Sequence, residues 1–364
     1  MRTRCLSMHA AYRCRHSGAC CQAGWDVDVE PHVVEAVTSG KVMPLSGAAV
    51  PFVPRRDETG GMSLARTTDG WCGFRNDHRC SLQQAGGEPM QPSACRHFPR
   101  LVLRDGRGML LALSHFCPTA AALLFDERPL TIVETGPPLA PAEPIEGLDA
   151  RDALPPLVRP GMLADIEGYA AWEEAVVREF TEAPSSPRAL ERIAAATERL
   201  RGWTPAHGAL ADAVAGAFAD ARGEPFDEDL SEAFGIIREV TGPHPLLHVE
   251  LGFLDAWRAL DAGAGPMLHR PVANYMAACA FGNWTAYRGQ GLRTVVAWLR
   301  GCYDVLRVQL VLQARSAGRL DAAGLTEAFR MADFILVHNV PSIEFGRAAV
   351  VFEQSASVTQ AGGS

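Results

Sequence analysis

The chain has 364 residues, of which 48 % are hydrophobic and 21 % are charged, a composition typical of globular proteins and not of disordered ones. Its formal net charge of −8 excludes a general electrostatic attraction to nucleic acid or to anionic membranes. No apolar stretch of signal-peptide length follows the basic first residues, and the most apolar long segment, residues 292–312, carries three arginines and one aspartate, which are too many charges for a membrane span. We therefore expect a cytoplasmic protein without nucleic-acid or membrane partners.

Short strands and loops are predicted for the first 125 residues. Apolar and acidic residues alternate in residues 25–29, a pattern typical of a half-buried strand. Two apolar runs flank an Asp-Gly pair within residues 101–113, which predicts a β-hairpin because this pair readily takes the positive φ angles of a tight turn. A short helix is expected at residues 119–125.

Proline-rich sequence follows, and then the hydrophobic pattern becomes helical. Residues 126–160 contain eight prolines, which block helix interiors, so we expect a linker with one strand near residues 130–134. From residue 161 on, apolar residues recur at helical spacing, and Ser186-Pro187 and Thr204-Pro205 are typical of an N-cap followed by proline. Helices are predicted at residues 166–180, 227–240, 246–260, 272–281, 292–315 and 322–338.

These patterns predict an α+β fold with an uneven division of the chain. A small cysteine-rich metal-binding module of short strands and loops is expected at residues 1–125, followed by the proline-rich linker at residues 126–160. An all-α helical domain is expected at residues 161–354, and a flexible tail at residues 355–364. The tail is small and polar in composition, as frayed chain ends are.

The strongest chemical signal is the distribution of cysteine. Eight of the ten cysteines lie before residue 118, and in a reducing cytoplasm clustered cysteines ligate metal more often than they form disulfides. The paired Cys-x-x-Cys knuckles of a zinc ribbon are missing, and the last cysteine of the set precedes proline, a recurring ending in cluster ligation. An iron–sulfur cluster is therefore favoured, with structural zinc as the alternative. The predicted metal ligands are Cys14, Cys20, Cys21, Cys72, Cys80, Cys95 and Cys117.

Other residues near this pattern are candidates for chemistry. Arg96 directly follows Cys95, and a cation beside thiolates favours their ionised form and offsets cluster charge. Asp26 and Asp28 share one face of the predicted strand, so they are candidate acids or bases in a cleft, with a solvent-facing position as the alternative. The two late cysteines, at positions 279 and 302, lie in apolar helical stretches and are expected to pack in the core.

The cysteine segments resemble the zinc- or iron-chelating cysteine-cluster family of the YkgJ type. The likeness spans roughly residues 10–120 and lies in the opening that ends at Cys20-Cys21, in the pair Cys72 and Cys80, and in Cys95-Arg96-His97-Phe98-Pro99. One position departs from the pattern, because Ser17 stands where the family usually has a further cysteine. Cys5 and His16 are the candidates to replace that ligand.

A narrower resemblance is to the flagellin lysine N-methylase branch of that family. It lies in Gly24-Trp25-Asp26-Val27-Asp28 and in the Ser-x-x-Cys-Pro-x-Ala-Ala run at residues 114–121. Two short helical segments, Asn274-Tyr275-Met276 and Val337-His338, are similar to segments of the branch as well. This branch implies an iron–sulfur enzyme that transfers a methyl group from S-adenosylmethionine to a lysine amine of a protein or peptide.

The chemistry that the branch implies sets requirements for this chain. No Gly-x-Gly-x-x-Gly fingerprint occurs between a strand and a helix, so the methyl donor is expected to bind at the cluster, with Arg96 and Trp25 as candidate cofactor-binding residues. Transfer needs a deprotonated lysine amine held in line with the donor methyl, and Asp26 or Asp28 is the candidate base. Two alternatives remain open: a cluster-dependent modifier of a peptide or small metabolite, and a non-enzymatic metal carrier or zinc-capped interaction protein.

Overall fold

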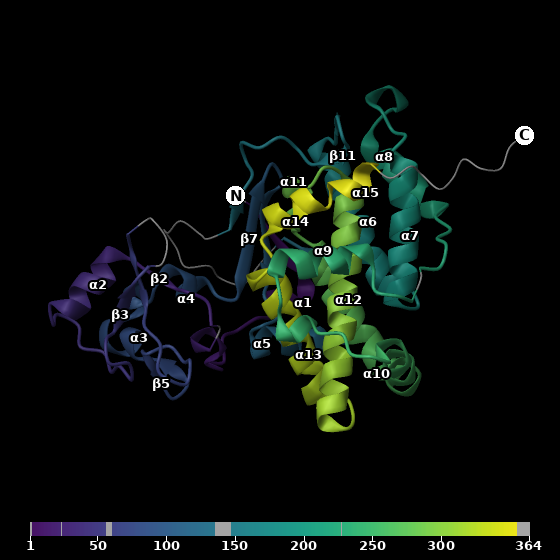
Figure 1. Ribbon diagram of the computed structural model, residues 1–364. Helices are drawn as coiled ribbons and strands as arrows, with labels where there is room; N and C mark the ends of the chain where they lie inside the picture. The colour runs from purple at the N-terminus through teal and green to yellow at the C-terminus, as the bar shows by residue number, and fades with distance from the viewer. Residues whose placement is uncertain (1, 23, 56–59, 135–146, 227, 355–364) are drawn as a thin grey trace, which may run out of the picture.

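The computed structural model describes residues 2–22, 24–55, 60–134, 147–226 and 228–354. Helices make up 54 % and strands 12 % of the described residues, and helices dominate the C-terminal part (Figure 1). The predicted combination of a strand-containing N-terminal part with a helical C-terminal part is confirmed at this level. The division into domains at residues 125 and 160 stays a prediction, and residues 135–146 of the expected linker and the tail after residue 354 lie outside the described residues.

A five-stranded sheet forms one layer of the body, in the order β10-β7-β8-β1-β9. Its centre is the predicted hairpin, in which β7 (Arg100–Asp105) pairs with β8 (Gly108–Leu113) from Arg100↔Leu113 to Asp105↔Gly108. The loop of the hairpin is Gly106-Arg107, and the positive φ angle expected for the Asp105-Gly106 pair lies instead at Gly108, at 114°. Glycine is needed there, because a Cβ would lie 2.6 Å from the carbonyl oxygen of Arg2. The outer strands are β1 (Thr3–Leu6), β9 (Ile132–Val133) and β10 (Leu148–Asp149).

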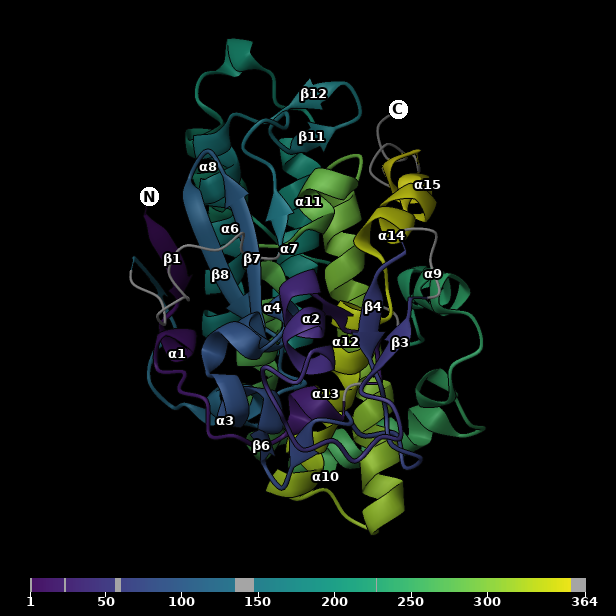
Figure 2. The same ribbon diagram turned by 90° about the vertical axis from the view of Figure 1, so that its left-hand side faces the viewer.

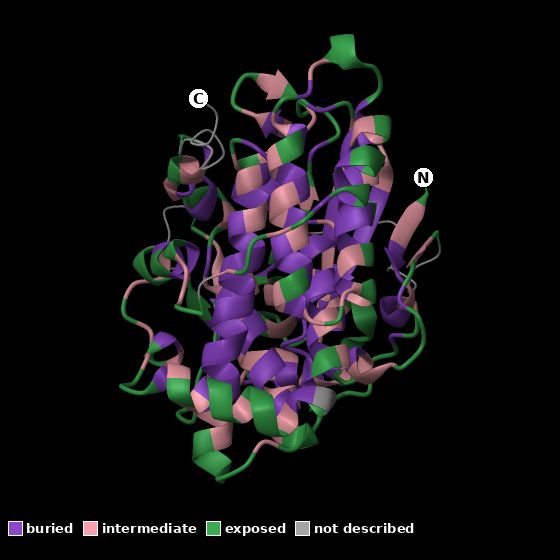
Figure 3. Cartoon of the chain, turned by 90° about the vertical axis from the view of Figure 1, so that its right-hand side faces the viewer, coloured by how far each residue is buried: buried purple, intermediate pink, exposed green. Residues whose placement is uncertain are grey.

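Helices cover the sheet and enclose the long helix α12 (Figure 3), whose middle is buried on nearly all sides. The longer helices are α6 (Ile166–Glu182), α7 (Ser186–Leu200), α8 (Leu210–Ala219), α9 (Glu232–Thr241), α10 (Phe253–Ala280), α12 (Leu292–Ala317) and α13 (Ala322–His338). The shorter ones are α1 (Ser7–Ala10), α5 (Pro118–Ala121), α11 (Thr285–Arg288), α14 (Ser342–Ala348) and α15 (Val350–Gln354). A small hairpin of β11 (Leu157–Arg159) and β12 (Met162–Leu163) precedes α6.

Some helix boundaries differ from the sequence prediction. The helix expected at residues 246–260 begins only at Phe253 and continues into the one expected at residues 272–281, so that one helix, α10, covers both. Its apolar face packs into the main core, which outweighs the backbone hydrogen bonds that Pro266 and Pro271 cannot donate. Ser185, one residue before the predicted position, caps α7 by accepting a hydrogen bond from the backbone of Arg188. Thr204 is a capping residue as predicted, but it precedes only a short 3₁₀ turn.

A second, smaller core lies in front of the sheet and the helices (Figure 2). It is built by a three-stranded sheet, β2-β4-β3, with β2 (Asp28–Val29), β3 (Phe52–Pro54) and β4 (Met62–Leu64), together with the helix α2 (Pro31–Thr38). The predicted strand at residues 25–29 is thus present but shorter. The buried side chains of this core are Val27, Val29, Val33, Phe52, Leu64, Phe74 and Leu82.

Within the described ranges, no helix is both long enough and apolar enough to cross a membrane. In α12, the long helix that the sequence singled out as too charged for a membrane span, the charged side chains of the middle turns are paired inside the protein. Arg307 donates to Asp304 at 3.0 Å, and the Arg300 guanidinium lies 3.4 Å from the same carboxylate. Because these charges are paired with each other, they can be buried in the centre of the helical layer.

Candidate active site and cysteine group

Five of the predicted ligands lie together, and we call Cys20, Cys21, Cys72, Cys80 and Cys95 the cysteine group. The sulfur atoms of the first two are 4.0 Å apart, and Cys21 also hydrogen-bonds to Cys72. The charges of Cys20 and Cys72 act on both remaining thiols. Segments that are far apart in the sequence therefore bring five thiols to one place in the second core.

Short, sharply turned segments position these thiols. Cys20 and Cys21 lie in a single 3₁₀ turn that begins after Gly18, at φ 75°. The backbone N–H of Cys72 donates to the carbonyl of Cys21 at 2.8 Å. Cys80 ends the small hairpin of β5 (Arg75–Asn76) and β6 (Arg79–Cys80), and Cys95 lies in α4 (Ser93–His97).

The thiols of the cysteine group have different protonation preferences. Burial raises the pKa of Cys80 and of Cys95. The hydrogen bond from Cys21 lowers the pKa of Cys72 to about 7, and the positive charge of Arg66 acts in the same direction. Cys21, as the donor to two sulfur atoms, has a raised pKa. The hydrogen bond with Cys21 also lowers the pKa of Cys20. Thiolate character is therefore favoured at Cys20 and Cys72, next to three thiols with raised pKa values.

As the side chains stand, no set of three or more His, Cys, Asp or Glu residues in the described segments is arranged as a finished metal site. The chemistry of the donors nevertheless fits a soft metal, because thiolates are the ligands that zinc and iron–sulfur clusters prefer. Cationic side chains also surround the group. Arg66 acts on Cys72, and the Nε atom of Arg75, on the hairpin that carries Cys80, is buried without a hydrogen-bond partner.

The other two predicted ligands lie elsewhere, around Tyr12. The Tyr12 hydroxyl is 3.8 Å from the sulfur of buried Cys117, and exposed Cys14 also acts on this hydroxyl, whose pKa is raised mainly by burial. Cys5 lies in β1 within a small apolar cluster, and burial raises the pKa of its thiol to about 11. Ser17 accepts a hydrogen bond from the backbone of Ala19 at 3.5 Å.

Asp26 and Asp28, the candidate bases, are both exposed. Asp28 forms an ion pair with Arg55, and neither aspartate lines the cavity described below. The structure thus places them on the solvent face, the alternative that the sequence left open. Arg96 is largely buried beside Cys95, with its guanidinium 3.9 Å from the Glu30 carboxylate.

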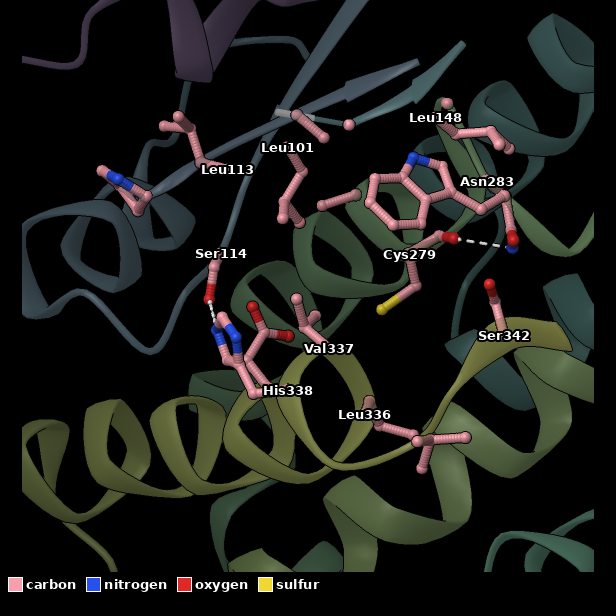
Figure 4. Close-up of a pocket in the computed structure, with 18 of the residues that line it drawn as sticks. Leu101, Leu113, Ser114, Leu148, Cys279, Asn283, Leu336, Val337, His338 and Ser342 are labelled. Atoms are coloured by element: carbon pink, nitrogen blue, oxygen red, sulfur yellow. Dashed lines mark hydrogen bonds between the residues drawn. The ribbon is translucent and has the colours of Figure 1, made fainter. Parts of the chain in front are cut away.

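A cavity of about 570 Å³ separates the second core from the helical layer (Figure 4). Trp25 and two residues of α4, Ala94 and His97, line one side. Most of the remaining lining comes from β7, β8, β10, α10, α11, α12, α13 and α14. Its surface is mostly apolar. Representative apolar lining residues are Leu101, Leu113, Leu148, Trp284, Trp298 and Leu336. Both late cysteines, Cys279 and Cys302, also line it, and Cys302 is buried in the main core as predicted.

His338 and Ser114 form one polar corner of the cavity (Figure 4), with Ser114 Oγ 2.9 Å from His338 Nε2. Ser114 is fully buried, and its Oγ also accepts a hydrogen bond from the backbone N–H of Phe116. Trp25 stacks on the imidazole with ring centroids 4.2 Å apart. Burial lowers the pKa of His338 to about 4, so the ring is neutral at physiological pH, and its tautomer sets whether Oγ or Nε2 is the donor.

A buried carboxylate, Asp333, forms a second polar group in the cavity wall. Its Oδ1 accepts a hydrogen bond of 2.9 Å from the Tyr275 hydroxyl. Its Oδ2 accepts one from the backbone N–H of His115 and lies 3.3 Å from Nδ1 of the same residue. His115 Nε2 in turn lies 3.2 Å from His9 Nε2. Burial keeps the pKa of His9 well below its ordinary value, so this second ring is neutral.

Several residues named in the sequence analysis meet at this cavity. They were named there only because they lie in segments that resemble the flagellin lysine N-methylase branch. Trp25, Ser114 and His338 line it, and Tyr275 holds its buried carboxylate. Asp333 itself was missed. A signal for it exists in the sequence, because this charge interrupts the apolar face of α13 between Phe329 and Leu336, and a charge on a buried helix face is uncommon without a role or partner.

Comparisons with known proteins identify no relative of this chain: no family model, no curated protein and no solved structure matches it. The likeness to the cysteine-cluster family therefore stays an expectation from the quoted residues. Function has to be argued from the cysteine group and the cavity beside it.

Proposed function

We propose that this chain is an iron–sulfur protein of the cysteine-cluster kind and an S-adenosylmethionine-dependent lysine N-methyltransferase-like enzyme that acts on a protein or peptide. The observation that carries the proposal is the position of the cavity. It adjoins the segments that carry the cysteine group through Trp25 and through Ala94 and His97 of α4, the helix that holds Cys95. Ligand sites are commonly found at such boundaries between packed units, in cavities of this size.

The cysteine group is the proposed holder of the metal. Cys20, Cys21, Cys72, Cys80 and Cys95 supply more thiolates than one cluster or one zinc ion needs. When bound, an iron–sulfur cluster supplies a soft Lewis-acidic and redox-active centre at this place. Arg66 and Arg75 offset the negative charge of the thiolates.

The cavity suits a lysine amine that must lose its proton before it can attack a methyl group. An apolar wall disfavours the charged ammonium, and the positive sulfonium of the donor disfavours a second cation beside it. Both effects lower the pKa of the amine. Because neither Asp26 nor Asp28 faces the cavity, we assign them no catalytic role. With its pKa lowered, the ammonium releases its proton to water before the methyl transfer, so no side-chain base is required.

Anaerobic purification tests the metal first. We expect bound iron and sulfide in matching amounts and a broad absorption band near 400 nm, together with methyl transfer from isotopically labelled S-adenosylmethionine to a lysine-bearing protein or peptide. C95S should lose both the metal and the transfer. C5S is the matched control, since this thiol is buried in β1 outside the cysteine group.

The outcomes separate the alternatives. A protein with cluster but no transfer to lysine, and with transfer to another peptide or metabolite group, would establish the second enzyme reading. A colourless protein that holds zinc under anaerobic reconstitution would favour the alternative in which zinc has a structural role in an interaction protein. Rapid loss of metal to a chelator would indicate a metal carrier.

A further inference from the structure

We infer that the cavity binds an organic onium cation, the sulfonium of the methyl donor, with the carboxylate of Asp333 as its counter-charge and aromatic side chains as its walls. The inference rests on the proposed function, because it assigns the donor of that reaction to a subsite. The inference can nevertheless be tested without measuring methyl transfer, because it states only that the cavity binds cations more tightly than neutral ligands of similar shape.

The first argument is the charge of the wall. Asp333 is 3 % exposed and lines the cavity, and a buried carboxylate needs compensation. Tyr275 and the His115 backbone supply hydrogen bonds but no charge. Among the described residues, no lysine or arginine forms an ion pair with Asp333, and its one partner that can carry a positive charge is the imidazole of His115.

The second argument is the nature of the remaining surface. Five aromatic side chains line the cavity: Trp25, Phe98, Phe281, Trp284 and Trp298. The faces of such rings attract cations, and aromatic walls are the usual recognition device for onium groups. Together with a buried carboxylate they make a cation site that also accepts methyl groups.

The other ionisable groups that line the cavity include two arginines, Arg100 and Arg288, and neither forms an ion pair with Asp333. Arg288, on α11, is exposed, and the Arg100 guanidinium lies over the ring of Tyr12, 5.6 Å from the ring centroid. His338 is neutral at physiological pH, and burial favours the protonated, neutral thiol of Cys302. His97, on α4, also lines the cavity.

The experiment compares ligand pairs that differ in charge and little in shape. The first pair is S-adenosylmethionine and S-adenosylhomocysteine, and the second is choline and its uncharged isostere 3,3-dimethyl-1-butanol. Binding to the full-length, metal-loaded protein is measured calorimetrically at pH 7.5. We expect the cation of each pair to bind about tenfold tighter or more.

The variant D333N should bring each affinity ratio to within about twofold of unity. D304N is the matched control, because Asp304 is an equally buried aspartate whose partners, Arg300 and Arg307, lie on α12, and it should leave both ratios unchanged. Using ratios removes any general loss of folded protein from the comparison.

Each result decides between distinct statements. Equal affinities within both pairs in the wild type would overturn the inference, even if the protein methylates lysine. If the wild type prefers choline to its uncharged isostere, loses this preference in D333N and does not bind S-adenosylmethionine, the cation site is supported. The same result would show that S-adenosylmethionine is not the ligand of this cavity. A preference that survives in D333N would overturn the role of Asp333.

Discussion

Trp25 stacks on His338, with ring centroids 4.2 Å apart and ring planes inclined by 18°. The two residues are 313 positions apart in the chain, so this contact joins the segment that follows Cys21 to the end of α13. It lies at the boundary between the second core and the helical layer, in the wall of the cavity. The arrangement of the cysteine group and the shape of the cavity are thereby connected through one indole ring.

We predict that W25A destabilises the protein by roughly 1–3 kcal/mol, because a half-buried indole loses both its apolar contacts and its aromatic partners. W25F should retain most of this stability, since a smaller ring can still lie on the imidazole. Urea unfolding followed by circular dichroism measures both variants. Equal stability of W25A and the wild type would show that the contact between the two cores does not depend on this ring.

The pH dependence of stability should report the neutral imidazole of His338. Its pKa is about 4 in the folded protein and 6.5 in the unfolded chain, so the unfolded chain binds the extra proton between these values. Stability is therefore complete above pH 6.5, falls as the pH is lowered toward 4, and changes no further on this account below that, a loss of roughly 2–3 kcal/mol.

Comparison of the wild type with H338F isolates this contribution, because His9 titrates in the same direction in both proteins. The free energy of unfolding of H338F should decrease less between pH 6.5 and pH 4. Parallel pH profiles for the two proteins would contradict the burial of a neutral His338.

Two Asp-x-Arg pairs of the same spacing should respond differently to the loss of arginine. Arg107 is buried and bridges Asp105 and Glu173, whereas Arg128 pairs with Asp126 on the surface. R107M strands two buried carboxylates and should cost about 3–5 kcal/mol. R128M leaves a solvated carboxylate and should cost nothing measurable. Thermal or urea unfolding of both variants makes the comparison, and a stable R107M would show that the buried carboxylates are protonated or otherwise compensated.

Metal content should separate the cysteine group from the cysteines around Tyr12. We expect C20S and C72S to lose most of the bound metal, because their thiols lie in the group. C14S and C117S should retain it, because their thiols lie near Tyr12. Elemental analysis after anaerobic reconstitution gives the stoichiometry. If C117S alone lost the metal, Cys117 would be a metal ligand after all, as its Cys-Pro sequence predicted.

Local sequence patterns were sufficient to predict those helices and strands whose formation depends mainly on residues close to one another in the chain. The Asp-Gly turn and its flanking apolar runs gave the hairpin β7–β8, and the periodicity of residues 322–338 gave α13 to the residue. Helix α10 was split in the prediction, because proline is a local signal against helix whereas the packing that keeps α10 continuous is a property of the whole core.

The sequence by itself determined that soft ligands are concentrated in the first 117 residues and that helices dominate the chain after residue 161. Which thiols meet, and what faces the cavity beside them, only the tertiary structure decided. Cys117 belongs to the same pattern as Cys95 in sequence, yet it lies at Tyr12, while Asp333 and Trp25 approach one cavity from opposite ends of the chain. The physical reason is that the spacing of residues along the chain determines where side chains point only within one turn or hairpin. Which distant segments come into contact is set by how the two cores pack.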